Sequence, residues 1–92
     1  MPSPQIGGLD FDDENEEKMW GHGIGIETAN QVLEHPFNVV RNRKDRRAPY
    51  LIIGIDRQGR CIAIPIEPTS RLGVWRPVTA WFCKKSEWGL CP

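Results

Sequence analysis

Residues 50–67, YLIIGIDRQGRCIAIPIE, hold two apolar runs on either side of a short turn, and this stretch decides the fold. The runs Tyr50–Asp56 and Arg60–Glu67 are rich in isoleucine, and Arg57-Gln58-Gly59 joins them. β-Branched residues favour extended backbone, and a glycine in a connection of this length is typical of a hairpin. Pro65 has no N–H to donate to a neighbouring strand, so it indicates a bulge or an outward-facing site. We therefore expect two antiparallel strands paired as a hairpin.

Shorter apolar segments on both sides of this hairpin complete a predicted antiparallel meander. Phe37–Arg41 precedes the hairpin, and Val74–Trp81 follows it after a turn over Pro68–Gly73. Both segments show the period of two that is typical of strands. Lys84–Leu90 is expected to form a short final helix. The second half of the chain is therefore expected to build one sheet from consecutive strands.

Two helices are predicted before the sheet. Asp12 precedes a helix over Asp13–Trp20, whose acidic first turn suits the positive end of the helix dipole. The second helix runs over Ile26–Glu34, where apolar residues recur at the three-to-four spacing of an amphipathic helix. Pro36 ends it, because the residue before a proline is pushed out of helical geometry. We expect Met19 and Trp20 to supply the buried side of the first helix, together with Phe11.

These elements indicate one α+β domain over residues 9–92, in the order β-α-α-β-β-β with a short C-terminal helix. Leu9–Phe11 supplies the first short strand. Residues 1–8, MPSPQIGG, are expected to form a disordered lead-in because of their prolines and glycines. The two N-terminal helices are expected to pack on one face of the antiparallel sheet, and the other face is expected to stay open.

The size of the chain limits its function. Ninety-two residues with a hydrophobic content of 39% allow only a small core, which excludes an elaborate cleft between two domains. Such chains are typically binding modules, subunits of complexes or minimal enzymes. The first twenty residues lack a basic start followed by an apolar run, so no signal peptide is expected, and no apolar stretch approaches membrane-spanning length. We expect a cytoplasmic protein without a membrane partner.

The cysteines support the same compartment. Cys61, Cys83 and Cys91 are odd in number and show no paired spacing, which fits a reducing cytoplasm better than a disulfide framework. We expect Cys61 to be a small buried side chain and Cys91 to be an exposed thiol. A zinc site from His22, His35 and the cysteines would need ligands that are scattered along the chain, so neither a metal nor another cofactor is expected.

The charges of the chain cancel in total but are not mixed. Residues 1–40 hold eight carboxylates and one base, for a balance of −7, whereas residues 41–92 hold eleven Lys or Arg and four carboxylates, for +7. Polyanion binding depends on local basic density, so the second half is able to present a face that attracts phosphate. The alternative is that the acidic start and the basic loop are solvated segments that partly neutralise each other.

Three segments together have the order and spacing of a known family. Residues 9–36, LDFDDENEEKMWGHGIGIETANQVLEHP, contain an aromatic–Asp strand, an Asn-bearing helix, a His-Gly turn and a helix ended by proline. Residues 49–67, PYLIIGIDRQGRCIAIPIE, form the hairpin, and residues 76–87, RPVTAWFCKKSE, form an arginine-led strand and a basic run. In these features the chain resembles the BrnT toxins of bacterial toxin–antitoxin modules, over residues 9–87.

The resemblance implies a RelE-like fold, metal-independent cleavage of RNA, and neutralisation by a ribbon-helix-helix antitoxin. RNA and such an antitoxin are therefore the expected partners, and a homodimer is left open. The sequence departs from the family where Trp81 follows Thr79-Ala80, because BrnT toxins usually have an arginine there. The long basic final helix of many members is also missing.

The resemblance favours Arg76 as the main phosphate-binding residue. RNA cleavage without a metal needs a base for the 2′-hydroxyl, cations for the crowded phosphate and an acid for the leaving oxygen. Arginine suits the phosphate because its planar fork pairs two oxygens. Arg76 opens the last predicted strand, and Arg41 and Arg60 lie at other strand ends. The alternative is a surface arginine at position 76 that pairs with Glu67 or Asp56.

His22 is the most attractive proton donor or acceptor near neutral pH, and it lies between glycines that let the chain bend around it. Its alternative role is to close the first helix by bonding to the last carbonyls. We expect His22, Arg76 and Arg41 to be catalytic. The cations expected to hold RNA beyond the reacting phosphate are Arg60, Arg43, Lys44, Arg46, Arg47, Lys84 and Lys85. The alternative is that these side chains only solvate the surface of the protein.

Trp75 and Trp81 are an even number of residues apart in the last predicted strand, so they are expected on one side of it. Two aligned tryptophans suit either the stacking of RNA bases or the docking of a protein partner. The second use defines an alternative function, which is a non-catalytic protein-binding module on the same scaffold. A third hypothesis is a nucleic-acid binder that works through the basic loop 41–47 alone.

Overall fold

The computed structural model describes residues 4–44 and 47–92, which form a mixed sheet with two α-helices. Both α-helices have the predicted bounds, so the expected α+β architecture is confirmed. The helices are α1 (Asp13–Trp20), α2 (Ile26–Glu34) and the 3-10 helix η1 (Lys85–Leu90). The strands are β1 (Gly8–Leu9), β2 (Asn38–Arg41), β3 (Tyr50–Ile55), β4 (Cys61–Pro68), β5 (Val74–Pro77) and β6 (Trp81–Phe82).

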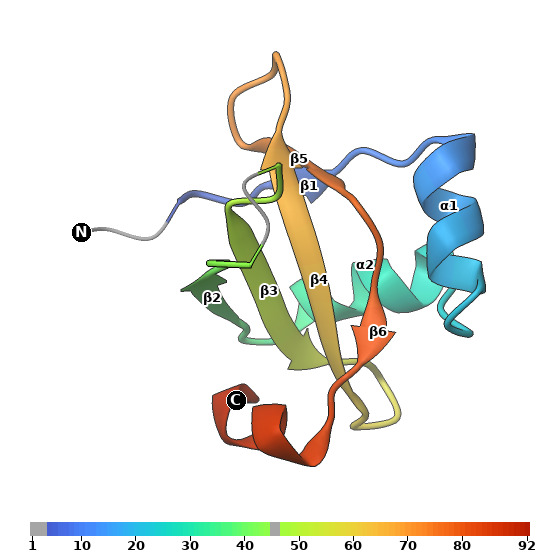
Figure 1. The fold of residues 1–92 in the computed structure, drawn as a ribbon, viewed down its shortest axis with the longest axis vertical. Helices are drawn as coiled ribbons and strands as arrows, with labels where there is room; N and C mark the ends of the chain where they lie inside the picture. Colours follow the sequence, from blue (N-terminus) through green and yellow to red (C-terminus); the bar gives the residue numbers. More distant parts are fainter. Residues whose placement is uncertain (1–3, 45–46) are drawn as a thin grey trace.

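The sheet is an antiparallel meander with one parallel strand added at its edge (Figure 1). Its order is β1-β5-β4-β3-β2, and β6 pairs with β4 nearer the start of β4 than β5 does. Strands β2 to β5 pair antiparallel in chain order, whereas β1 runs parallel to β5. The predicted hairpin forms as β3 and β4, with Ile52 opposite Ile64.

The prediction of one last strand over residues 74–81 is wrong. β5 ends at Pro77, which has no N–H to donate to the sheet. The next N–H, that of Val78, donates instead to Pro65 O at 2.9 Å. Regular pairing resumes only at Trp81, so two short strands replace the predicted single one.

One extra residue lies in the interruption between β5 and β6. Ile66 is opposite Pro77, and Ala63 is opposite Trp81. The chain therefore takes four steps from Pro77 to Trp81, whereas β4 takes three steps between their partners. This is the geometry of a bulge, and it moves the following side chains to the opposite face of the sheet from the one that simple alternation predicts.

Part of the predicted lead-in over residues 1–8 belongs to the sheet. Its residues 1–3 lie outside the described part of the chain. The N–H groups of Gly7 and Gly8 donate to Gly73 O at 2.7 and 3.3 Å, and Gly8 begins β1. Gly7 and Gly8 are therefore part of the folded edge of the sheet, because their backbone groups are hydrogen-bonded to it.

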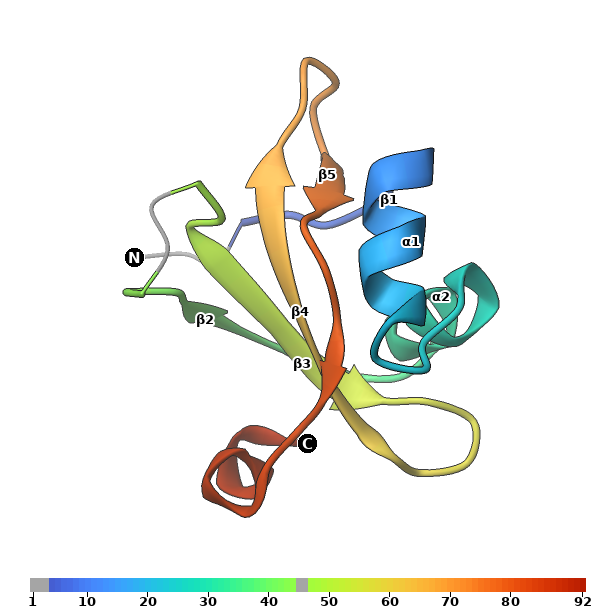
Figure 2. The same cartoon turned by 45° about the vertical axis from the view of Figure 1, so that its right-hand side comes forward.

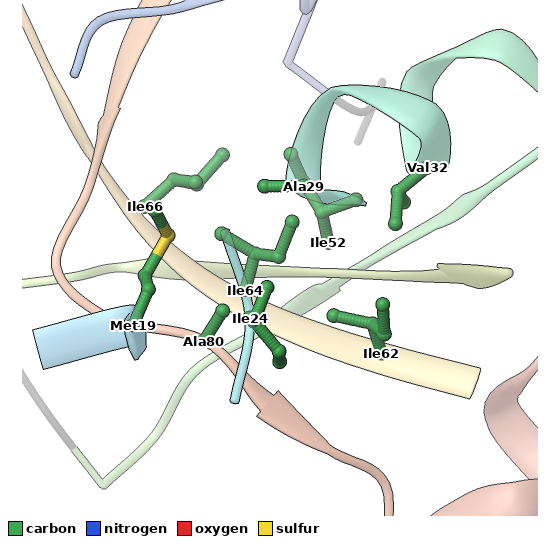
Figure 3. Close-up of a cluster of buried hydrophobic side chains, with 9 residues drawn as sticks. All are labelled: Met19, Ile24, Ala29, Val32, Ile52, Ile62, Ile64, Ile66 and Ala80. Carbon is green, nitrogen blue, oxygen red and sulfur yellow. The ribbon is translucent and has the colours of Figure 1, made fainter. Parts of the chain in front are cut away.

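The two α-helices cover one face of the sheet, and Figure 2 shows them together on that side. Their apolar side chains meet the even-numbered positions of β3 and β4, so the odd-numbered positions of these strands face away from the helices. No helix in the described ranges combines the length and the apolar character that a membrane span requires. The buried cluster consists of Met19, Ile24, Ala29, Val32, Ile52, Ile62, Ile64, Ile66 and Ala80 (Figure 3).

Local hydrogen bonds fix the start of α1. Asp12 Oδ1 accepts from the Asn15 N–H at 2.8 Å, and Asn15 Oδ1 accepts from the Asp12 N–H at 2.9 Å. The buried Asn15 also donates from Nδ2 to Asp10 O at 3.1 Å, which ties the helix to the segment after β1. The prediction that Met19 and Trp20 both lie on the buried side of α1 is confirmed for Met19, which is fully buried, and wrong for Trp20, which is 70% exposed.

The cysteine prediction is wrong for two of the three residues. Cys61 at the start of β4 forms a disulfide with Cys91, and their Cα atoms are 6.1 Å apart. Cys83 is a free, half-buried thiol. The two bonded cysteines are 30 residues apart and become neighbours only because η1 returns the chain to the start of β4. The disulfide therefore ties the segment after β6 to the sheet.

Gly54 is a point of close contact between the sheet and the helical layer. A Cβ at this position would lie 2.8 Å from Val32 Cγ1 and 3.0 Å from Phe37 Cβ. We expect Gly54→Ala to lower the free energy of unfolding by about 1–3 kcal/mol, the usual cost of overpacking a core. Chemical denaturation measures this change. Gly89→Ala is the control, because a Cβ there meets nothing within 4 Å. Unchanged stability of Gly54→Ala would contradict the packing of α2 on β3.

Candidate nucleic-acid interface around Trp81

Trp81 lies on the sheet face that the α-helices leave uncovered. It is opposite Ala63, an odd-numbered position of β4, so its side chain shares a face with Pro65. The basic loop after β2 crosses toward the same face, because Arg47 Nε lies 3.0 Å from Glu67 Oε2 near the end of β4. The loop and β6 therefore border one surface, although they are distant in the sequence.

Two adjoining hollows meet at Trp81, and together they are called the Trp81 groove below. The first hollow has a volume of about 430 Å³, and the second has a volume of about 690 Å³. Lys44, Trp81 and Glu87 line both hollows. The other lining residues are Arg41, Asn42, Arg43, Leu51, Pro65, Val78 and Thr79 in the first and His22, Phe82, Lys84 and Ser86 in the second.

Four of the lining residues are cations that form no ion pair in the described part of the chain. Arg41, Arg43, Lys44 and Lys84 lie in the groove, and none of them forms an ion pair with a described carboxylate. Arg41 ends β2, Arg43 and Lys44 come from the loop after it, and Lys84 comes from the segment after β6. The groove therefore collects positive charge from two separate parts of the sequence.

Four arginines outside the groove are, in contrast, neutralised by carboxylates. Each of them has a guanidinium nitrogen 2.6–3.0 Å from a carboxylate oxygen. An ion pair must be broken before such a group can bind phosphate, so these positions are poorer anion sites than the groove. The pairs are Arg47 with Glu67, Arg57 with Glu34, Arg60 with Asp56, and Arg76 with Asp12.

Among the described residues that line the groove, Glu87 is the one carboxylate. Its Oε1 accepts from the Lys84 N–H at 2.8 Å and from Trp81 Nε1 at 3.3 Å. Glu87 therefore caps η1 and orients the indole of Trp81. This role of Glu87 was not predicted, although a Glu three residues after the start of a predicted helix is a known capping signal.

Thr79 contributes an unsatisfied hydroxyl to the first hollow. Its Oγ1 is buried and has no hydrogen-bond partner among the described residues. Buried polar atoms nearly always have a partner, so this hydroxyl is an exception among the described residues, and its lack of accessible surface keeps it from contacting a ligand in this conformation. In the sequence, Thr79 was noted only as part of the family resemblance. No sequence pattern predicts that a hydroxyl lacks a hydrogen-bond partner.

Arg76, the first choice for a catalytic cation, does not line the groove. Its Nε and Nη2 donate to the Asp12 carboxylate at 2.6 and 3.1 Å, and its Nη1 donates to Glu67 at 3.0 Å. The side chain is only 17% exposed. Its alternative pairing with Glu67 is confirmed, whereas Asp56 pairs with Arg60 instead. Arg76 therefore joins α1 to the sheet.

We expect Arg76→Met to destabilise the fold more than Arg71→Met, because Asp12 and Glu67 would lose their shared cation. The Arg76 guanidinium and then the Asn15 N–H hold the pKa of Asp12 below its ordinary value. The ionised Asp12 therefore stabilises the fold at pH values above its ordinary pKa, and this stabilisation is lost as the pH falls through the lowered pKa. Denaturation of both variants at neutral and acid pH measures the difference. Equal stabilities at neutral pH would contradict the role of Arg76 between α1 and the sheet.

Arg60 also lies outside the groove and is held by other groups. Its Nε is 2.8 Å from Asp56 Oδ2, and its guanidinium carbon lies 4.9 Å from the ring centre of Phe82, a cation–π distance. The three arginines that were expected to hold RNA, Arg41, Arg60 and Arg76, therefore do not line one groove. Only Arg41 lines the groove, because the other two are drawn to nearby carboxylates.

The remaining predicted RNA-binding cations divide between the groove and its surroundings. Arg43, Lys44 and Lys84 line the groove, as described above. Arg47 pairs with Glu67 and helps to position the loop. Lys85 is exposed on η1 and lines neither hollow. The predicted cation Arg46 lies outside the described residues.

Trp75 and Trp81 lie on opposite faces of the sheet, so the predicted shared patch is wrong. Trp75 is opposite Pro68, on the face of the buried cluster, and it contacts Tyr50 edge-to-face with ring centres 5.7 Å apart. Its Nε1 donates to Gln5 O at 3.0 Å. The extra residue between β5 and β6 is the physical reason for the separation. Of these two tryptophans, Trp81 alone lines the groove.

His22 lies in the turn after α1 and lines the second hollow. Its backbone N–H donates to Met19 O at 2.9 Å, and Gly23 adopts a φ of +80°, which favours glycine. The backbone of His22 therefore closes the helix. Its exposed imidazole lines the same hollow as Lys44 and Lys84, which come from other segments.

No protein-family model matches the chain, and no curated protein has significant sequence similarity to it. Within the described ranges, no three His, Cys, Asp or Glu side chains are grouped as a metal site would need. The chemistry that the groove offers consists of an indole, an imidazole and cations that form no ion pair within the described ranges. These groups suit phosphate oxygens, a nucleobase and proton transfer.

Proposed function

We propose that the chain binds single-stranded RNA in the Trp81 groove, as a toxin similar to BrnT in the bacterial cytoplasm. The observation that carries the proposal is the distribution of cations. Among the described residues, four cations without an ion pair line the groove, whereas four arginines elsewhere are already neutralised. Phosphates bind where they meet cations that need not first leave a carboxylate, and the release of counterions then drives association.

The position of Trp81 favours a single strand over a duplex. Lys44, Trp81 and Glu87 are shared by both hollows, with Arg41 and Arg43 on one side and Lys84 on the other. A base that stacks on the indole would thus have cations on both sides for its flanking phosphates. The bases of an A-form duplex are stacked on each other and cannot reach an indole in this way.

The salt dependence of binding tests the proposal. We expect a labelled single-stranded RNA to bind with a log–log salt slope of roughly −3, because four neutralised phosphates contribute about −0.7 each. A duplex of the same sequence should bind more weakly. Fluorescence anisotropy over a salt series measures both quantities. Tighter binding of the duplex, or affinity that does not change with salt, would contradict the proposal.

Trp81→Ala should weaken the binding of single-stranded RNA by about tenfold or more, because stacking contributes roughly 1–3 kcal/mol per base. Trp20→Ala is the matched control, since Trp20 is 70% exposed on α1 and lines neither hollow. Arg76→Met should also leave the affinity unchanged at a temperature where the variant is folded. A loss of affinity in either control that equals the loss in Trp81→Ala would contradict the assignment of the groove.

A second candidate function is RNA cleavage, which His22 favours because it lines the same hollow as Lys44 and Lys84. The resemblance to BrnT implies a RelE-like fold and metal-independent cleavage, in which an imidazole would move the proton of the 2′-hydroxyl and cations would hold the phosphate. Expression should then arrest growth and yield RNA fragments with 2′,3′-cyclic ends. His22→Ala should abolish them and His35→Ala should not. If the RNA stays intact, the cleavage hypothesis is contradicted, and the chain binds RNA without cutting it.

The partner implied by the resemblance is a ribbon-helix-helix antitoxin. That antitoxin would neutralise the toxin if it covered Trp81, which would serve as an aromatic anchor for the antitoxin. The antitoxin and RNA should then compete in the anisotropy experiment. A non-catalytic module that holds a protein through Trp81 is the alternative, and harmless expression together with partner capture that is lost in Trp81→Ala would favour it.

A further inference from the structure

The segment after β6 borders the RNA groove and is attached to the sheet by a few bonds. Cys91 follows η1 and is joined to Cys61 in β4 by the disulfide. Asn38 Nδ2 donates to Leu90 O at 2.6 Å. No residue of η1 is buried, so the apolar burial that usually holds a helix in place is small here. The disulfide is therefore the strongest attachment of this segment.

The same segment carries the carboxylate that opposes phosphate in the groove. Glu87 lines both hollows beside the four cations that form no ion pair with a described carboxylate, and its Oε1 lies 3.3 Å from Trp81 Nε1. A phosphate that enters this space would meet a fixed negative charge and an indole N–H that is already bonded. The carboxylate of Glu87 and a phosphate in the same groove repel each other, so Glu87 in its present position lowers the affinity of the groove for an anion.

We propose that the Cys61–Cys91 disulfide is a redox latch on the RNA groove, which holds Glu87 against Trp81 when oxidised and releases it when reduced. This inference rests on the proposed RNA binding. Reduction frees the chain beyond β6, so that η1 moves away and the groove gains positive charge. Oxidation returns Glu87 to the groove and weakens the binding of RNA. The disulfide thus regulates the site without contacting the ligand.

Reduction by a dithiol is a balanced reaction. One thiolate of the dithiol attacks a sulfur of the disulfide, the S–S bond breaks, and the other cysteine leaves as a thiolate that takes up a proton. The second thiol of the dithiol then displaces the protein from the mixed disulfide. Two electrons and two protons reach Cys61 and Cys91, and the dithiol becomes a cyclic disulfide. Both cysteines line an open hollow of about 600 Å³ beside Arg60 and Trp88, through which the reductant can approach.

Cys83 lines the same hollow but is a poor reactant for internal exchange. Burial raises the pKa of its thiol to about 11, and the charge of Glu87 adds to the shift. Because only the thiolate attacks a disulfide, Cys83 is almost entirely unreactive at neutral pH. The state of the latch therefore depends on an external dithiol, and Cys83→Ser should retain the full redox response.

The test compares the oxidised chain with the chain reduced by dithiothreitol. Affinity for single-stranded RNA should rise about 5-fold on reduction at roughly 0.1 M salt, because the removal of one opposing charge acts like one added phosphate contact. Hydrogen exchange should become faster over residues 85–92. The double variant Cys61→Ser with Cys91→Ser should show both changes without reductant, and Glu87→Gln should show the affinity gain while still oxidised.

Several outcomes would overturn the inference. If RNA binds equally well to both forms, or more weakly to the reduced form, the disulfide does not restrain the groove in the way proposed and the RNA-binding proposal stands alone. Unchanged hydrogen exchange over residues 85–92 with altered affinity would show that reduction acts elsewhere. If neither form binds RNA, the proposed function fails, and the regulation of that site fails with it.

Discussion

A chain with serine in place of the four groove cations should bind single-stranded RNA roughly 10²- to 10³-fold more weakly than the unchanged chain at about 0.1 M salt. Each lost phosphate contact removes about 0.7 from the log–log salt slope, so the slope should approach zero as the affinity falls. Anisotropy over a salt series measures both. The substitutions are Arg41→Ser, Arg43→Ser, Lys44→Ser and Lys84→Ser, and none of these residues has an ion pair in the described ranges whose loss would unfold the chain.

A pair of double variants with the same change in net charge provides the control. Arg43→Ser with Lys44→Ser removes two cations from the groove, whereas Arg71→Ser with Lys85→Ser removes two exposed cations that line neither hollow. The first double variant should lose roughly 25-fold in affinity and the second much less. Equal losses would mean that RNA responds to total charge rather than to the groove, which supports a diffuse electrostatic attraction instead.

Asp56→Ala should cause the largest loss of stability of any single substitution considered. Asp56 is 1% exposed, and its carboxylate accepts from the N–H groups of Gln58 and Arg60, both at 2.9 Å, and from Arg60 Nε at 2.8 Å. These bonds hold the turn between β3 and β4. Their removal leaves the donors without a partner, and we expect the free energy of unfolding to fall by roughly 3 kcal/mol. Chemical denaturation measures this loss, and Asp10→Ala, at an exposed carboxylate, is the control.

The pH dependence of stability gives an independent check on Asp56. Burial alone would raise its pKa, but the N–H groups of Arg60 and Gln58 and the Arg60 guanidinium outweigh burial and lower it. A lowered pKa means that Asp56 stabilises the fold above its ordinary pKa and loses this effect as the pH falls through the lowered one. Asp56→Ala should therefore have a flatter stability profile in acid. A profile parallel to that of the unchanged chain would contradict the role of this carboxylate.

The helices could be predicted from the sequence because their boundaries depend on neighbouring residues. Asp12 caps α1 through Asn15, three positions away, and Pro36 lies just beyond α2. The hairpin of β3 and β4 was predicted for a similar reason, since Gly59 adopts a φ of +77° in a short turn. Where structure follows from contacts within a few residues, sequence patterns were sufficient.

The faces of the last two strands could not be predicted, because they depend on a bulge. Alternation placed Trp75 and Trp81 on one side, but Pro77 interrupts the pairing with β4 and one extra residue reverses the later side chains. A proline in a strand signals a break, yet it does not say how many residues the break contains. That number depends on the partner strand.

The groove was predicted in part. A high density of basic residues identified Arg41, Arg43, Lys44 and Lys84, but the sequence could not separate free cations from paired ones. Arg76 is neutralised by Asp12, which is 64 residues away, and such a pair appears only when the chain is folded. The disulfide was missed for the same reason, since its cysteines are 30 residues apart and have no paired spacing.

The most direct test of RNA binding at Trp81 is a titration followed by the indole N–H signals of the four tryptophans in a two-dimensional NMR spectrum. The signal of Trp81 should shift progressively with single-stranded RNA. Those of Trp20, which is exposed on α1, and Trp75, which bonds to Gln5 O on the other face, should stay in place. A stationary Trp81 signal while Trp20 or Trp75 moves would contradict the proposal.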